Sequence, residues 1–355
     1  IKQRLFEMSS DDWIFVFIAL TFFFLPTGTA PPLISSGIAL LIWIFSGKFK
    51  QVPSIVKQPW FWPVIPCVIL PWVGLLYSQN VELGLDYALK SKYWLAVFLT
   101  AGIEINTRRV AIIVRFLWLG LFLGSLLALL QIFSLVPPIR ADFLGFGVVH
   151  TLAGMFLIVG ILSASYYYEK NRKHGWVFIL LIAAYIFHLT ILRGRSAYLI
   201  FIFVSPIVAK HLMHNYSHFV KTVVGILLAV SLILSPDVRL EVTETFSNLK
   251  NHKEAILRGD NVILFPRPFM IRESVRIFLE NPLSGIGTGS IIEVTKEHGP
   301  AVHHPHNNFL YMAASFGIWG ILACFWLFYK FFIYSWPERK GALGSFVFSS
   351  GLVLF

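Results

Sequence analysis

Long apolar runs, separated by short polar connections, are the feature that most restricts how this chain can fold. A helix that crosses a lipid bilayer needs about 20 consecutive, mostly apolar residues. The runs that approach this length are 12–26, 32–46, 60–77, 91–105, 110–134, 148–168, 176–192, 196–212, 222–236, 308–335 and 342 onward. They predict an all-α polytopic membrane protein with about 11 visible spans.

The predicted organisation follows from these runs. Residues 1–236 hold spans one to nine, residues 237–307 form a long connection, and residues 308–355 hold spans ten and eleven. The last run is still apolar at Phe355, so we expect a twelfth span beyond it.

The composition agrees with a chain that uses lipid as part of its solvent. Hydrophobic residues make up 57% of the sequence and charged residues 13%, whereas roughly a quarter of a soluble domain is charged. The net charge of +11 would suit nucleic acid, but the basic residues are spread among short loops. We therefore expect membrane lipid, and no nucleic acid, as a partner. Cys67 and Cys324 lie inside apolar runs and are interpreted as packing residues.

Lys and Arg in short loops mark the cytoplasmic side of a membrane protein. Here they occupy the N-terminus and alternate connections: Lys2, Arg4, Lys48, Lys50, Lys57, Arg108, Arg109, Lys170, Arg172, Lys173, Lys210, Lys221, Arg339 and Lys340. The N-terminus is therefore predicted to be cytoplasmic, and segments 78–90, 193–195 and 237–307 to face outward. In a bacterium this orientation means the inner membrane, with those segments in the periplasm.

The connection 237–307 is about 70 residues long, and connections of that length usually carry structure or function. Apolar spacing predicts helices over Val238 to Leu249 and Pro268 to Glu280, the second ended by Asn281-Pro282. The predicted subdomain is thus a large helical periplasmic loop. The following Gly285–Gly289 stretch has no Lys-Ser/Thr after it and no strand before it, so we interpret it as a tight turn rather than a nucleotide loop.

Two polar clusters interrupt the apolar pattern on the predicted outward side. Arg193 and Arg195 lie between two spans, and His303, His304 and His306 precede span ten. Ionisable groups at such places are candidate functional residues by default. The guanidinium fork suits phosphate oxygens, although an arginine at a helix end can also simply extend its charged head to the interface.

His306 is the candidate proton acceptor, because histidine titrates near neutral pH. A metal site made by His303, His304 and His306 is the alternative, and a helix cap at Asn307 is another. We favour no metal, because neither cysteines nor closely spaced carboxylates accompany these histidines and no Asp-x-Asp pair is present.

Three motifs resemble the O-antigen ligase and polymerase superfamily. Residues 193–199 resemble its R-G-R-x-x-x-L signature, and Arg272 with Asn281-Pro282-Leu283-Ser284-Gly285-Ile286-Gly287 is similar to its second signature. His306-Asn307-Asn308-Phe309-Leu310 with Phe316-Gly317-Ile318-Trp319-Gly320 is similar to the third. The resemblance covers roughly 148–335, in the family's order. Ser315 departs from it, since members often carry an acidic residue there.

This resemblance implies transfer of a glycan from undecaprenyl diphosphate to an acceptor hydroxyl in the periplasm, with no cofactor and no metal. The acceptor is a lipid A core sugar in the ligases, a growing lipid-linked glycan in the polymerases, and a protein side chain in related enzymes. The motif just after a single large loop favours the ligase.

The expected roles are divided between catalysis and binding. Fixed cations stabilise the charge that develops on a diphosphate leaving group, and a base activates the acceptor hydroxyl; direct displacement inverts the anomeric centre. The expected catalytic residues are His306, Arg195 and Arg272, and the expected substrate-binding residues are Arg193, Asn307, His303, His304 and Arg276.

A polysaccharide transporter or flippase is the non-enzyme alternative. Transporters tend to show inverted repeats and charged or broken helices near the midplane. The sequence shows no evident repeat, and its key charges lie at the outer ends of spans.

Overall fold

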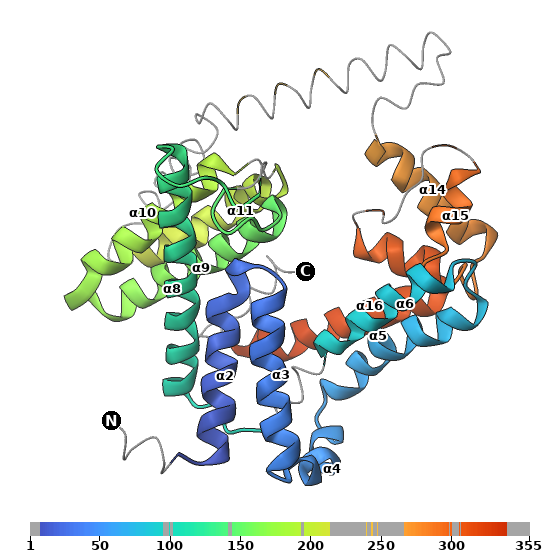
Figure 1. Cartoon of the computed structure of the whole chain (residues 1–355), viewed down its shortest axis with the longest axis horizontal. Coiled ribbons are helices and arrows are strands. Elements are labelled where there is room, and N and C mark those ends of the chain that lie inside the picture. Colours follow the sequence, from blue (N-terminus) through green and yellow to red (C-terminus); the bar gives the residue numbers. More distant parts are fainter. Residues whose placement is uncertain are drawn as a thin grey trace. The chain divides into compact units, whose positions relative to one another are not determined.

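The computed structural model describes residues 8–94, 99, 102–140, 144–192, 195–213, 239, 243, 247, 266–297, 299, 305 and 307–338. These residues are predominantly helical, and none of them forms a strand (Figure 1). The prediction of an all-α chain is therefore confirmed for the part of the sequence that is described.

The described chain divides into two compact units. Unit 1 comprises the described residues within 1–46, 103–244 and 335–355, and unit 2 those within 47–102 and 245–334. The helices of unit 1 are α2 (Ser10–Phe24), η1 (Leu25–Thr27), α3 (Ala30–Phe45), α8 (Thr107–Ile132), α9 (His150–Lys170), η5 (Arg172–His174), α10 (Gly175–Ile191) and α11 (Arg195–Leu212). Unit 2 contains η2 (Lys48–Gln51), α4 (Val52–Val56), α5 (Phe61–Val73), η3 (Gly74–Tyr77), α6 (Val81–Leu89), η4 (Lys90–Trp94), α14 (Pro266–Glu280), α15 (Ile291–Lys296) and most of α16 (Asn308–Glu338).

Five helical segments are long and apolar enough to cross a membrane, or six if the bent pair Ala30–Phe45 and Lys48–Val56 counts as one. The five are Ser10–Thr27, Thr107–Ile132, His150–Lys170, Arg172–Ile191 and Asn308–Ser335. Two predicted spans, 60–77 and 196–212, correspond to shorter apolar helices. The predicted spans 222–236 and 342 onward, and most of the helix expected over 238–249, lie outside the described residues. The full count of about 11 spans and the large outward loop therefore stay predictions.

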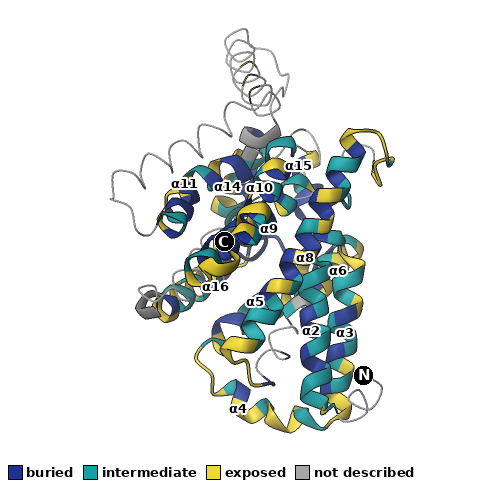
Figure 2. Cartoon of the chain, turned by 90° about the vertical axis from the view of Figure 1, so that its left-hand side faces the viewer, coloured by how far each residue is buried: buried dark blue, intermediate teal, exposed yellow. Residues whose placement is uncertain are grey.

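Unit 1 is built around α9, which is the most buried of the candidate spans (Figure 2). Its small residues allow close contact with neighbouring helices: a side chain at Gly160 would meet Leu121 and Tyr185. Two buried polar groups of this core are paired: Trp118 Nε1 donates to Ser163 Oγ at 2.7 Å, and the Tyr185 hydroxyl donates to the Trp118 carbonyl at 2.8 Å. This pairing removes the penalty for burying polar groups in an apolar interior.

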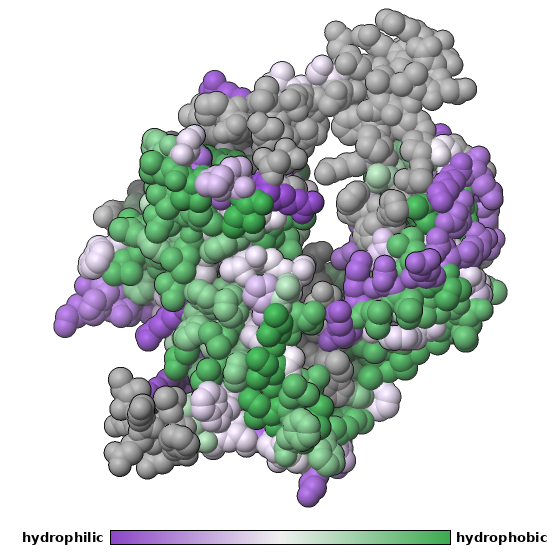
Figure 3. Space-filling model, viewed as in Figure 1, coloured by the Kyte–Doolittle hydropathy of each residue, from purple (hydrophilic) through white to green (hydrophobic). Residues whose placement is uncertain are grey.

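Large apolar side chains also cover the outside of the helices. Phe45, Phe203, Trp319 and Phe325 are all more than half exposed, and Figure 3 shows hydrophobic residues over much of the face that it views. Exposed apolar surface of this extent marks contact with lipid or protein, which agrees with a membrane protein.

Candidate functional site

The glycine-rich segment after α14 forms hydrogen bonds with residues 314–318 of α16. Backbone hydrogen bonds run in both directions between them: Ile286 N–H to the Ala314 carbonyl (3.0 Å), Gly287 N–H to the Ser315 carbonyl (2.9 Å) and Ile318 N–H to the Pro282 carbonyl (2.8 Å). Residues 281–289 and 307–320, which the sequence singles out as separate motifs, therefore form one structure within unit 2.

Glycine is required at this junction because the two backbones lie too close for a side chain. Gly287 has φ +86°, and a Cβ there would lie 2.6 Å from the Gly74 carbonyl oxygen. Gly317 has φ +61° and ψ −142°, and its Cβ would lie 2.6 Å from the Leu283 carbonyl carbon. Non-glycine residues rarely adopt such angles. The interpretation of 285–289 as a turn of close backbone approach is confirmed.

Gly317 also reverses the direction of α16. The Phe309 ring lies 5.8 Å from the Phe325 ring and 5.0 Å from the Phe328 ring. In a straight helix, residues 309 and 325 would be roughly 24 Å apart at 1.5 Å per residue. Segment 308–335, predicted as one continuous span, is therefore a short helix that turns back at Gly317 into a longer one, because the hydrogen bonds to 282–287 hold the break open.

Hydrogen bonds from hydroxyl, amide and backbone groups hold the same segment and α15 against the α5–α6 region. Thr288 donates through N–H to the Gly74 carbonyl (3.1 Å) and through Oγ1 to the Pro71 carbonyl (2.7 Å). Ser78 Oγ donates to the Thr288 carbonyl at 2.6 Å, and Asn80 Nδ2 donates to Glu293 Oε1 at 2.8 Å. These anchoring residues were not anticipated from the sequence, in which they look like ordinary polar residues.

The helix α14 confirms the element expected over 268–280 and carries two of the candidate arginines. The Arg272 side chain is 70% exposed, and its guanidinium lies 5.4 Å from the Phe269 ring centre. Its Nε donates to Glu273 at 3.3 Å; among the described residues, its terminal nitrogens have no hydrogen-bond partner. Arg272 thus presents free donors to an anion.

Arg276, one turn later, is held by carboxylates. Its Nε donates to Glu273 at 2.9 Å and its Nη1 to Glu280 at 2.8 Å. Glu273 is only 3% exposed, and a buried carboxylate must be paired to be tolerated. We missed Glu273 in the sequence, although its four-residue spacing from the buried Phe269 and Ile277 would have placed it on the inner face.

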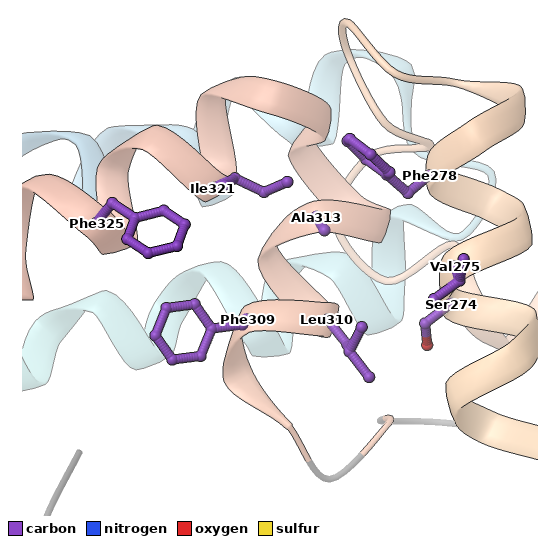
Figure 4. Close-up of a pocket in the computed structure, with 8 residues that line it drawn as sticks. All are labelled: Ser274, Val275, Phe278, Phe309, Leu310, Ala313, Ile321 and Phe325. Carbon is purple, nitrogen blue, oxygen red and sulfur yellow. The ribbon is translucent and has the colours of Figure 1, made fainter. Parts of the chain in front are cut away.

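An apolar groove of about 400 Å³ lies between α14 and α16. Figure 4 shows α14 on one side and both limbs of the reversed α16 on the other. Ser274 is the one polar side chain in its lining, which consists of Ser274, Val275, Phe278, Phe309, Leu310, Ala313, Ile321 and Phe325. A hydrocarbon chain matches this lining, because burying apolar surface is favourable and the groove offers almost nothing to a polar ligand.

Asn307 caps the first turn of α16 at this groove. Its Oδ1 accepts a hydrogen bond from Leu310 N–H at 3.0 Å, and its carbonyl accepts from Tyr311 N–H at 2.9 Å. The helix cap at Asn307, one of the alternatives that the sequence left open, is therefore present. Leu310 also lines the groove, so the exposed Asn307 lies next to the apolar lining, at the positive end of the helix dipole.

The structure describes less of the other predicted site residues. Arg195 begins α11 in unit 1, while Arg193, His303, His304 and His306 lie outside the described residues. Arg272, Arg276 and Asn307 share unit 2. That these three residues form one site with Arg195 and the histidines stays a prediction.

Two further predictions concern histidines: the structural role of His188 and the alternative of a metal site. His188, expected to be a hydrogen-bonded residue of the bundle, is buried with Nδ1 3.1 Å from Ser125 Oγ. No group of three His, Cys, Asp or Glu side chains suited to a metal occurs among the described residues. The three histidines of the metal alternative, His303, His304 and His306, lie outside the described residues.

Comparison of the sequence with models of known protein families and with curated proteins gives no match.

Proposed function

We propose that this protein is an inverting glycosyltransferase that moves a glycan, an O-antigen, from undecaprenyl diphosphate to a sugar hydroxyl of the lipid A core. The proposal starts from the three motifs at 193–199, 272–287 and 306–320 and their resemblance to the O-antigen ligase and polymerase superfamily. It needs no cofactor and no metal.

One observation carries the proposal furthest: the second and third motifs interlock and flank an apolar groove. Residues of α14 and of the first turn of α16 line this groove, Arg272 lies one turn before Val275 of the lining, and Asn307 caps the first turn of α16. A lipid diphosphate is an amphiphile that requires both an apolar channel and cationic or N–H donors. This combination supports a lipid-linked donor over a water-soluble sugar nucleotide.

The charges suit the proposed chemistry. As the bond from the anomeric carbon to the diphosphate breaks, the electron pair leaves with the phosphate oxygen, and negative charge grows there. The exposed guanidinium of Arg272, together with Arg193 and Arg195, stabilises that charge in place of a metal ion. Arg276 remains a proposed substrate-binding residue. Its hydrogen bonds to Glu273 and Glu280 within α14 also hold the Glu273 carboxylate, which accepts from Arg272 Nε.

His306 takes the proton of the acceptor hydroxyl as the carbon–oxygen bond forms, a step typically worth about 10²–10⁴-fold in rate. Asn307, His303 and His304 bind the sugars near it. Because attack comes opposite the leaving diphosphate, the anomeric configuration inverts. We expect His306→Ala to abolish transfer in an inserted, folded protein, and His303→Ala and His304→Ala to be milder.

A transfer assay in the presence of a chelator tests this assignment. Equal loss in all three histidine variants, together with loss of activity on chelation, would replace the base with a metal site.

The reaction belongs on the periplasmic face of the bacterial inner membrane, with the N-terminus in the cytoplasm. A polymerase that extends a lipid-linked glycan, a transferase that modifies protein, and a flippase are the alternatives. Lipids extracted from cells that lack the protein separate three of these. Unligated lipid-linked polymer indicates the ligase, and single repeat units a polymerase or a flippase. Single units that a membrane-impermeant reagent reaches only after the cells are lysed indicate the flippase.

A further inference from the structure

The helix α14 has two faces of opposite character. Phe269, Glu273 and Ile277, spaced by four residues, are buried. Ile271, Val275 and Leu279, also spaced by four, form an outer ridge whose side chains are 50%, 41% and 69% exposed. Because four residues make about one turn, the ridge runs along one side of the helix from residue 271 to residue 279. An isolated exposed leucine is ordinary, but a continuous apolar ridge marks a contact surface.

The α14 ridge continues into the apolar outside of α16. Val275 belongs both to the ridge and to the groove between α14 and α16, and Phe325 lines the other side of that groove. Phe325 is itself 61% exposed, on the part of α16 that follows the reversal at Gly317. That part belongs to a segment apolar enough to cross a membrane. The ridge and the outer surface of a membrane-capable helix are thus one apolar surface.

The charge beside the ridge indicates which partner covers it. Arg272 lies next to the ridge, is largely exposed, and carries a permanent positive charge. The other charges in the described part of α14 pair with one another, Arg276 with Glu273 and Glu280. Amphipathic helices with a basic residue beside the apolar face are suited to the membrane interface, with the apolar face about 5–10 Å into the boundary between headgroups and acyl chains. Anionic phospholipid headgroups complement this charge.

We infer that α14 is an interfacial helix, whose Ile271–Val275–Leu279 ridge is inserted into the adjacent leaflet of an anionic phospholipid bilayer. The segment 266–280 is then a membrane-bound element rather than a water-exposed part of a loop. Its position keeps Arg272 at the level of lipid phosphates and opens the α14–α16 groove sideways to the hydrocarbon. This inference goes beyond the proposed reaction and does not depend on glycosyl transfer.

Spin-label accessibility in vesicles tests the inference. The full chain, with Cys67→Ser and Cys324→Ser, carries one nitroxide at Ile271→Cys or Leu279→Cys, and the control is Lys296→Cys on α15, whose native side chain is 51% exposed. The protein is reconstituted in phosphatidylethanolamine–phosphatidylglycerol vesicles. Collision with oxygen, which concentrates in lipid, is compared with collision with a water-soluble nickel chelate.

Labels at 271 and 279 should collide more with oxygen than with nickel, and the label at 296 more with nickel. Nickel accessibility at 271 and 279 equal to that at 296 would overturn the inference, because the ridge would then face water. Low accessibility to both reagents would also overturn it, since protein, such as a second copy of the chain, would cover the ridge. A correct lipid signal from an inactive protein would leave the inference standing and count against the proposed reaction alone.

Discussion

Arg272 and Arg276 are neighbours on the surface of α14, yet their surroundings give them different tasks. Arg272 is 70% exposed, and its terminal nitrogens have no hydrogen-bond partner in the described part of the chain. Arg276 is 26% exposed and is shared between Glu273 and Glu280. An arginine that binds a ligand needs N–H donors that are not already hydrogen-bonded. An arginine that neutralises a buried carboxylate uses its donors for that carboxylate. The same residue type therefore predicts different consequences of mutation at the two positions.

We expect Arg272→Lys to lower turnover by about 10²-fold, because lysine keeps the charge but loses the bidentate fork. The unfolding midpoint should fall only slightly, because the lost bond from Arg272 Nε to Glu273 is long, at 3.3 Å, and Arg276 still pairs with Glu273. Arg195→Lys should lose most activity as well, and Arg193→Lys less. Arg276→Ala should instead lower the free energy of unfolding by roughly 1–3 kcal/mol, since Glu273 is left with a single partner. Kinetics and thermal unfolding of the same preparations measure both effects. Full activity in Arg272→Lys and Arg195→Lys would mean that the diphosphate is held elsewhere.

The pKa of Glu293 in α15 predicts how the stability of the fold changes with pH. The Asn80 amide and then Lys296 donate hydrogen bonds that lower the pKa of this carboxyl below its ordinary value of 4.5. A lowered folded pKa stabilises the fold at pH values above 4.5, and that stabilisation disappears as the pH falls through the lowered value. Glu293→Gln should therefore lose less stability on acidification than the parent protein. The unfolding midpoint measured from neutral to acidic pH checks this, and parallel curves for the two proteins would rule it out.

At the scale of elements, the reversal of α16 determines the candidate site. It brings Phe309 and Phe325 to the same groove, and it holds the start of the helix, with Asn307, beside α14. The reversal depends on Gly317 and on the hydrogen bond from Ile318 to Pro282. A straight helix over 308–338 would separate these groups.

We expect Gly317→Ala to destabilise the protein by at least about 1–3 kcal/mol, because a side chain at φ +61° is strained and its Cβ would overlap Leu283. Gly37→Ala in α3 is the matched control. Apart from the nearby backbone of α3 itself, no atom of the described residues lies within 4 Å of the added methyl group, so this change should stabilise the helix by roughly 0.5–1 kcal/mol. Chemical unfolding in detergent measures both variants. Equal stability of Gly317→Ala and the parent would mean that α16 does not need the reversal.

Elements that depend on local pattern could be predicted from the sequence, and those that depend on distant partners could not. Apolar runs and the Asn281-Pro282 stop predicted α8, α9, α10 and α14 closely, because these signals lie within each helix. Gly317 lies inside an apolar run, so its break becomes visible only through its contacts with 282–283. Glu273 has the same limitation, since a buried and an exposed glutamate look alike without their partners.

For the molecule as a whole, the proposed reaction depends on how the chain is oriented in the membrane. Basic residues fall on alternate connections, which predicts that 193–195 and 237–307 face the periplasm. Five or six helical segments of the described chain are long and apolar enough to cross a membrane; the other spans that this arrangement requires, and the orientation, stay predictions. The proposed donor and acceptor must meet on that outward side.

Labelling with a membrane-impermeant thiol reagent tests the orientation. After Cys67 and Cys324 are replaced by serine, Ser196→Cys and Ser247→Cys should react in intact spheroplasts. Ser54→Cys, in a predicted cytoplasmic connection, is the control and should react only after lysis. Labelling of 196 and 247 only after lysis would reverse the topology.

The most direct test of the central claim is glycan transfer by the purified full chain in vesicles. Undecaprenyl-diphosphate-linked glycan and a lipid A core acceptor are supplied with a chelator, and the product is followed by gel and mass spectrometry. We predict a ligated glycolipid with inverted anomeric configuration from the parent protein, and almost none from Arg272→Lys or His306→Ala. No product from the folded parent protein, or full transfer by both variants, would contradict the account.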